Sequence, residues 1–283
     1  MKILINYMIL LLLLACKSKE QADNEIIWSN VQKNDKKMPE PQTGDWLFYH
    51  KEKGQTFEEY KKIKYVTPTS TRNVIYVLPI GNFDAKQNEL IQHTSEYLEI
   101  FFNLKVKRYK PISDSIIPAN ARRISAFDIE QLWASYILNP FLKKRLPEDA
   151  IAFIAITEKD LYPEPSWNFV FGLATNNLGV MSIYRLLENE DYTLCLERLI
   201  KVIAHEMGHM FSVSHCTHAM CLMNGSNTME ETDKQPNRLC SECLKKLSWN
   251  LKFNDRERLQ RMASFFKKHG LTIDYELIQK DLE

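Results

Sequence analysis

The sequence lacks three features that would assign a class of protein by composition alone. It has no excess of one charge: 37 basic and 36 acidic residues give a net charge of +1, so its composition does not support a nucleic-acid partner. No internal repeat or low-complexity block is present, which argues against a repeat architecture. The apolar run at residues 3–14 has about twelve residues, fewer than the ~20 that a membrane-spanning helix needs.

That short apolar run has the features of an export signal. It follows a basic start, Met1-Lys2, and ends at Leu13-Leu14-Ala15-Cys16, which resembles a bacterial lipobox. We expect residues 1–15 to be a lipoprotein-type signal peptide, with lipidation at Cys16. The protein would then lie in the cell envelope, anchored in a membrane and facing the periplasm or the cell exterior. An uncleaved helical anchor is the alternative.

The remaining residues predict a tether followed by one domain. Residues 16–46 are polar and charged, and we interpret them as a flexible tether. Residues 47–283 are long enough for one sizeable domain. Apolar runs predict strands at 74–80, 104–109, 150–156, 169–173 and 180–186, and helical spacing predicts helices at 90–102, 127–145, 192–211 and 255–268. Because strands alternate with helices, we expect an α/β fold with a mixed sheet.

The segment from His205 to Cys216 carries the main chemical signal. On a helix, His205 and His209 project from one face and can bind one Zn²⁺. Glu206 lies between them and can act as general base on a zinc-bound water. His215 follows His209 by six residues, so the chain must turn to bring it back as a third ligand. Such a pattern without its third histidine arises by chance in roughly one chain in a hundred. Three histidines leave one coordination position open, as in a catalytic zinc site.

Four cysteines follow as two closely spaced pairs, Cys216 with Cys221 and Cys240 with Cys243. Two such pairs separated by a loop indicate a structural four-cysteine zinc site. Two disulfides are the alternative, since the chain is expected to leave the cytoplasm. A disulfide across Cys240-Ser241-Glu242-Cys243 would close a very short loop and contribute little stability.

Together these motifs resemble the archaemetzincin family of zinc metallopeptidases. The resemblance covers residues 74 to 268 and includes the flanking segments 76–81, 168–172, 223–227 and 243–247. It implies a metzincin-like mixed twisted β-sheet with an active-site helix and a small C-terminal zinc-stabilised subdomain. It also implies two Zn²⁺ ions per chain: a catalytic ion held by His205, His209 and His215, and a structural ion held by Cys216, Cys221, Cys240 and Cys243.

The resemblance assigns Met223 to the Met-turn, beneath the catalytic zinc without binding it. The sequence departs from the family pattern at Ser212, where the family has a glycine. Because the chain has to double back there, we expect Ser212 in the left-handed region, at a free-energy cost on the order of 1 kcal/mol. The spacer between Met223 and Cys240 is sixteen residues, one fewer than in the family pattern.

We therefore predict a zinc metallopeptidase that acts as a monomer on a peptide or protein substrate. A non-catalytic, zinc-stabilised lipoprotein that binds peptides or a partner protein is the alternative from another class, and hydrolysis of a bond other than a peptide bond is a third. His50, His93 and His269 are isolated in the sequence, and no role is predicted for them.

Overall fold

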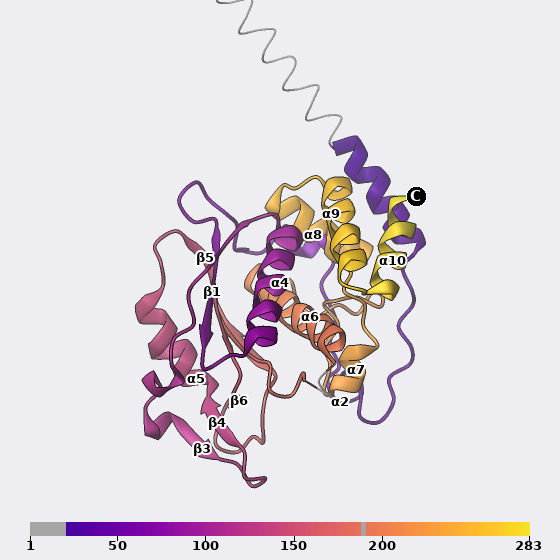
Figure 1. Cartoon of the computed structure of the whole chain (residues 1–283). Coiled ribbons are helices and arrows are strands. Elements are labelled where there is room, and N and C mark those ends of the chain that lie inside the picture. Colours follow the sequence, from indigo (N-terminus) through magenta and orange to yellow (C-terminus); the bar gives the residue numbers. More distant parts are fainter. Residues whose placement is uncertain (1–20, 188–190) are drawn as a thin grey trace, which may run out of the picture.

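A computed structural model describes residues 21–187 and 191–283, and its centre is a five-stranded mixed sheet (Figure 1). The strand order is β2-β1-β5-β8-β7, in which β1 pairs in parallel with β2 and β5, β5 pairs in parallel with β8, and β7 is antiparallel to β8. This is the predicted mixed α/β sheet. The strand bounds are β1 Val74–Ile80, β2 Lys105–Arg108, β5 Ala150–Thr157, β7 Gly172–Thr175 and β8 Leu178–Ser182.

Strands β1 and β5 are buried along their whole length. Alternate side chains of a strand point to opposite faces of its sheet. On one face, Ile75 and Ile154 join a core shared with helices α4 (Ala85–Phe102) and α6 (Tyr192–Met210). On the other, Tyr76 and Phe153 join a second core. Burial on both faces explains why these strands are continuous apolar runs in the sequence.

The prediction of one helix at 127–145 is wrong, because its first part forms a strand of a small second sheet. Its strand order is β3-β4-β6, and β4 occupies the first part of that predicted helix. The buried side chain of Gln131 donates to Asp160 Oδ2 at 2.7 Å and to the Asn168 carbonyl oxygen at 2.8 Å, and these long-range contacts override the local helical spacing. The bounds are β3 Arg122–Ile124, β4 Glu130–Trp133, β6 Asp160–Tyr162, α5 Ala134–Tyr136, η3 Ile137–Leu142 and η4 Lys143–Arg145. Helical geometry is interrupted at Asn139, next to Pro140.

Helices α4 and α6 lie between the main sheet and a group of C-terminal helices (Figure 1). The predicted helix at 255–268 is confirmed as α9. The predicted strands at 169–173 and 180–186 are displaced by a few residues and form the β7–β8 hairpin. The remaining helices are α2 Trp46–Tyr49, α3 Phe57–Tyr60, η1 Asp114–Ile116, η2 Ala119–Ala121, α7 Met229–Asp233, α8 Ser241–Leu251, α9 Asp255–Lys268 and α10 Thr272–Leu282.

The described part of the N-terminal segment is not the flexible tether that the sequence predicted. Residues 21–33 are helical, and Ile27 and Val31 are buried in the main core. The Trp28 indole donates to Asp255 Oδ2 at 2.7 Å, and Asp35 lies 3.3 Å from the Arg238 guanidinium. The tether prediction is therefore wrong from residue 21 onward, because Ile27 and Val31, one helical turn apart, pack into the core. Cys16 and the predicted signal peptide lie outside the described residues. Within the described residues, no helix is long and apolar enough to span a membrane.

Candidate metal centres

The first centre is built on the end of α6. Asp191 caps the start of this helix by accepting a hydrogen bond from Leu194 N at 3.0 Å. The helix ends at Met210, and Ser212 has φ of +67°, as predicted. Ser212 N donates to the His209 carbonyl oxygen at 2.8 Å and Val213 N to the Gly208 carbonyl oxygen at 3.0 Å, which is the Schellman arrangement. This turn brings His215 back toward the helix.

The three predicted histidines meet at this turn. One ring nitrogen from each of His205, His209 and His215 lies within 4.8 Å of the others. The Nε2 atoms of His205 and His209 are 3.0 Å apart, close to the separation expected of two ligands on one zinc ion with bonds of 2.0–2.1 Å. The donor set therefore fits zinc.

Hydrogen bonds fix the orientation of all three rings. Nδ1 of His205 donates to the Leu222 carbonyl oxygen at 2.8 Å, and Nδ1 of His209 donates to the Val213 carbonyl oxygen at 2.7 Å. Nδ1 of His215 lies 2.9 Å from Oε1 of Glu52. When Nδ1 carries the proton, Nε2 presents its lone pair, as metal binding requires. Glu52 was missed in the sequence, since 163 positions separate it from His215 and no motif links them.

The electrostatics of the site favour neutral imidazoles. Burial lowers the pKa of His205 to about 4 and the pKa of His209 to about 4. Both rings are therefore uncharged at neutral pH. Burial also raises the pKa of Glu206 above its ordinary value, which makes it more basic than an exposed carboxylate.

A cleft of about 790 Å³ opens onto the histidines, with Glu206 in its lining. The N-terminal segment forms one wall, because the Trp46 ring stacks on His50 at 3.9 Å and meets the His215 ring edge-on at 5.1 Å. A Cβ atom at Gly225 would lie 2.4 Å from the Trp46 ring, so the indole fits only beside a glycine. Trp46 also had no signal in the sequence, because its partners lie in distant segments.

Met223, assigned to the Met-turn by the family resemblance, packs against α6. Its side chain is fully buried, and a Cβ atom at Gly208 would come within 2.4 Å of its sulfur. Gly208 lies on α6 just before His209, so the methionine packs against the helix that carries the histidines.

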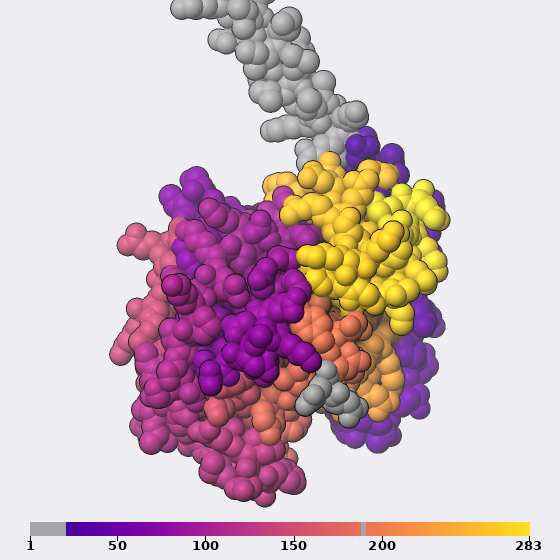
Figure 2. Space-filling model, viewed as in Figure 1, coloured from indigo at the N-terminus to yellow at the C-terminus, as the bar shows by residue number. Residues whose placement is uncertain are grey.

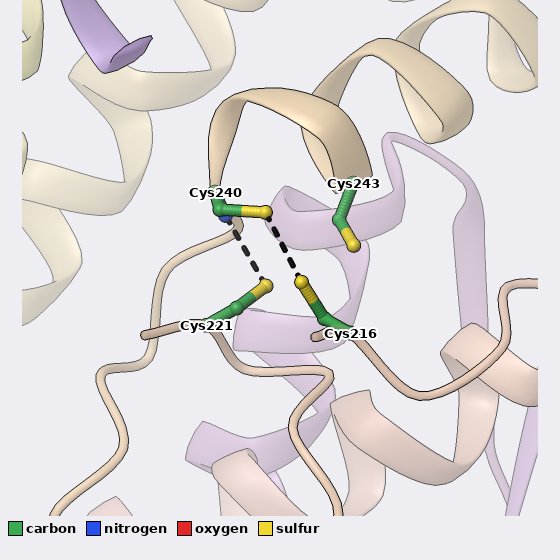
Figure 3. Close-up of side chains that lie close together, drawn as sticks. All are labelled: Cys216, Cys221, Cys240 and Cys243. Atoms are coloured by element: carbon green, nitrogen blue, oxygen red, sulfur yellow. Dashed lines mark hydrogen bonds between the residues drawn. The ribbon is translucent and has the colours of Figure 1, made fainter. Parts of the chain in front are cut away.

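The second centre contains the four predicted cysteines (Figure 3). Cys216 and Cys221 come from the loop after α6, and Cys240 and Cys243 come from the start of α8. All four are buried and unbridged, and their sulfurs lie within 4.8 Å of one another. The sulfurs of Cys216 and Cys240 are 3.4 Å apart, far longer than the roughly 2.05 Å of a disulfide.

The surroundings of these sulfurs suit thiolate ligands. Cys221 Sγ accepts hydrogen bonds from Met223 N at 3.4 Å and from Cys240 N at 3.2 Å. The buried ammonium of Lys246 lies 3.9 Å from Cys243 Sγ. Four thiolates around one Zn²⁺ carry a net charge of −2, so a buried cation beside them offsets part of that charge. The donor set fits a closed tetrahedral zinc site.

A mixed sheet, a helix with two histidines one turn apart, and a third histidine returned by a turn define a metallopeptidase of the metzincin class. Residues 138–249 match the family model of Peptidase family M54. The chain is 34% identical over 258 residues to Archaemetzincin-2 of Rattus norvegicus, covering 78% of this chain and 72% of the relative. It is 32% identical over 178 residues to Archaemetzincin of Saccharolobus islandicus, covering 60% and 90% respectively.

The fold agrees with these matches. The crystal structure of Archaemetzincin from Methanopyrus kandleri superimposes with a TM-score of 0.53 and 27% identity, covering 66% of this chain and 99% of that one. The chain belongs to the archaemetzincin family and is a zinc metallopeptidase.

Proposed function

We propose that the chain hydrolyses peptide bonds, with His205, His209 and His215 holding the catalytic zinc and Glu206 acting as general base. The observation that carries this proposal is the convergence of three oriented imidazoles beside Glu206 in one open cleft. Zinc, when bound there, would lower the pKa of a water ligand to about 7 and polarise the scissile carbonyl. Glu206 would accept the proton of the attacking water and deliver it to the leaving amine.

We also propose that the four cysteines hold a second, structural zinc, which makes two ions per chain. Their free sulfurs, the amide groups that donate to Cys221 and the buried Lys246 support this assignment over two disulfides. An ion bound by all four cysteines would join the loop after α6 to the start of α8. It would therefore support the turn that places His215.

The test of the catalytic proposal is Glu206→Gln. The amide has nearly the same size but cannot accept the proton, so the variant should keep its fold and its zinc and lose at least 100-fold in peptide hydrolysis. Cleavage of a peptide library, followed by mass spectrometry, gives the readout, with zinc content measured in parallel. Wild-type turnover in this variant would refute the general-base assignment. A wild-type protein that binds peptides without cleaving them would instead support the non-catalytic alternative.

For localisation, we propose a membrane-anchored lipoprotein with its lipid on Cys16. The basic start, the short apolar run and Leu13-Leu14-Ala15-Cys16 support this. Cys16→Ser removes the thiol that accepts the lipid, so the variant should lose acyl-chain labelling and remain as an unprocessed precursor. Equal electrophoretic mobility of the two proteins, with no label on the wild type, would refute the lipoprotein proposal.

A further inference from the structure

A second histidine cluster lies where α4, α6 and α9 meet, away from both centres described above. His93 and Glu96 are one turn apart on α4, and His269 is the residue after α9. One potential ligand atom from each of these three residues lies within 4.8 Å of the other two. Figures 1 and 2 show α4 lying beside the C-terminal helices on one face of the molecule.

The ring of His93 is held in a defined orientation. Its Nδ1 lies 2.6 Å from the Tyr192 hydroxyl, and its side chain is only 12% exposed. Nε2 is therefore the atom left to bind a metal. Oε1 of Glu89 lies 4.0 Å from this atom. Tyr192 begins α6, and His205 lies thirteen residues further along that helix, or roughly 20 Å at 1.5 Å per residue.

One ring nitrogen of His269, Nε2, is buried without a hydrogen-bond partner in the described part of the chain. A buried polar atom without a partner destabilises a fold, because it has lost its hydrogen bonds to water. The ring centroids of His93 and His269 are 4.2 Å apart. Burial, and then the neighbouring His93, lower the pKa of His269, so its ring is neutral and can offer a lone pair.

Both carboxylates beside the rings favour a cation. Glu96 is 39% exposed and Glu89 is 59% exposed, so each side chain can rotate toward an ion. The Lys268 ammonium lies 3.5 Å from Glu96 Oε2 and would compete with that ion. Because Lys268 is 61% exposed, its side chain can move into solvent when a metal binds.

We propose that His93, Glu96 and His269 form a third metal site, for a divalent transition-metal ion of the zinc type. Imidazole nitrogen suits such ions, and one carboxylate completes a three-ligand set. Ligand atoms on one zinc ion lie roughly 3.3 Å apart, given bonds of 2.0–2.1 Å. The cluster therefore has to contract, and the exposed Glu96 side chain can supply that movement. The ion would join the middle of α4 to the end of α9.

The alternative is that the two histidines only fill space. The His269 ring also lies 4.4 Å from the Phe265 ring, so aromatic packing contributes to its position. Packing alone leaves the buried Nε2 of His269 without a partner. It also predicts that zinc binding does not depend on these residues.

Zinc stoichiometry separates the two explanations. Full-length protein in detergent, first dialysed against zinc-free buffer, is then equilibrated with increasing free Zn²⁺ and analysed for bound metal. The wild type should take up one further ion, and His93→Gln/His269→Gln should not. Glu96→Gln, at a more exposed position, should weaken this binding at least tenfold. Lys268→Gln should tighten it, because it removes the competing cation.

Matched controls are available on the same chain. His218→Gln changes an exposed histidine outside the cluster, and Glu276→Gln changes an exposed glutamate on α10. Both should bind the additional ion as the wild type does. Circular dichroism and peptide hydrolysis check that the cluster variants are folded. Equal zinc uptake by the wild type, the double histidine variant and Glu96→Gln would overturn the proposal, whether or not the histidine and cysteine centres hold zinc.

Discussion

The histidine centre and the cysteine centre differ most in their access to solvent. The three histidines are half-buried and line a cleft, whereas all four cysteines are buried. Three ligands leave a position for a reacting water, while four ligands close the coordination sphere. One family motif thus supplies two neighbouring sites, for which we propose separate tasks. In this proposal the histidine centre carries out the chemistry, and the cysteine centre holds the loop that returns His215.

The largest expected effect comes from removing two ligands of the cysteine centre. Cys240→Ser/Cys243→Ser removes two of the four sulfurs, and structural zinc stabilises small domains by roughly 10–16 kcal/mol. Whole domains are stable by only about 5–15 kcal/mol, so we expect loss of cooperative thermal unfolding and of activity together. Calorimetry measures both the unfolding temperature and the enthalpy.

A matched control for this prediction is Cys195→Ala. Cys195 is a buried, unbridged cysteine of α6 outside the cluster, so its loss should lower stability by only about 1 kcal/mol. If the double cysteine variant unfolded at the same temperature as Cys195→Ala, the structural role of the cysteine centre would be wrong.

A smaller effect is expected from the side chain that orients the third histidine. Glu52→Gln keeps the size of the side chain but removes the carboxylate that accepts from His215 Nδ1. Loss of such a partner typically lowers metal affinity or activity by 10–100-fold. We expect this loss with the unfolding temperature nearly unchanged, since the cysteine centre is untouched. Competition with a chelator measures the zinc affinity.

Glu58→Gln is the control, because Glu58 lies in the same segment but is exposed and forms an ion pair with Lys61. Both variants should fold alike, and only Glu52→Gln should bind the catalytic zinc less tightly. Equal zinc affinities would show that His215 does not depend on Glu52 for its orientation.

The smallest effect is expected at Ser212. Glycine would relieve the left-handed strain of about 1 kcal/mol, but Ser212 Oγ accepts a hydrogen bond from Val66 N at 3.2 Å, worth a similar amount. Ser212→Gly should therefore change the free energy of unfolding by less than about 1 kcal/mol and leave activity unchanged. Ser212→Ala keeps the strain and loses the bond, so it should be the less stable of the two in denaturant titrations. The reverse order would show that strain at this turn is negligible.

Short-range patterns predicted most of the scaffold, and they identified the residues that gather into the histidine and cysteine clusters. The spacing of His205, His209 and His215 and of the cysteine pairs fixes which residues can share an ion, and the apolar runs identify β1 and β5. Contacts between segments that are far apart in the sequence were not predicted. Trp46 reaches the cleft from the end of the segment predicted to be a tether. Glu52 contacts His215 from a position far away in the sequence, and β4 forms because Gln131 hydrogen-bonds to Asp160. His93 and His269 each look isolated until α4 and α9 pack together.

Zinc content tests the division between an open and a closed site most directly. Elemental analysis is made on full-length protein dialysed against zinc-free buffer, so that loosely bound surface metal is removed. The wild type should hold two zinc ions per chain. His205→Ala should hold one and keep its unfolding temperature while losing hydrolysis. One ion or none in the wild type, with no free thiols at Cys216, Cys221, Cys240 and Cys243, would contradict the account in favour of disulfides.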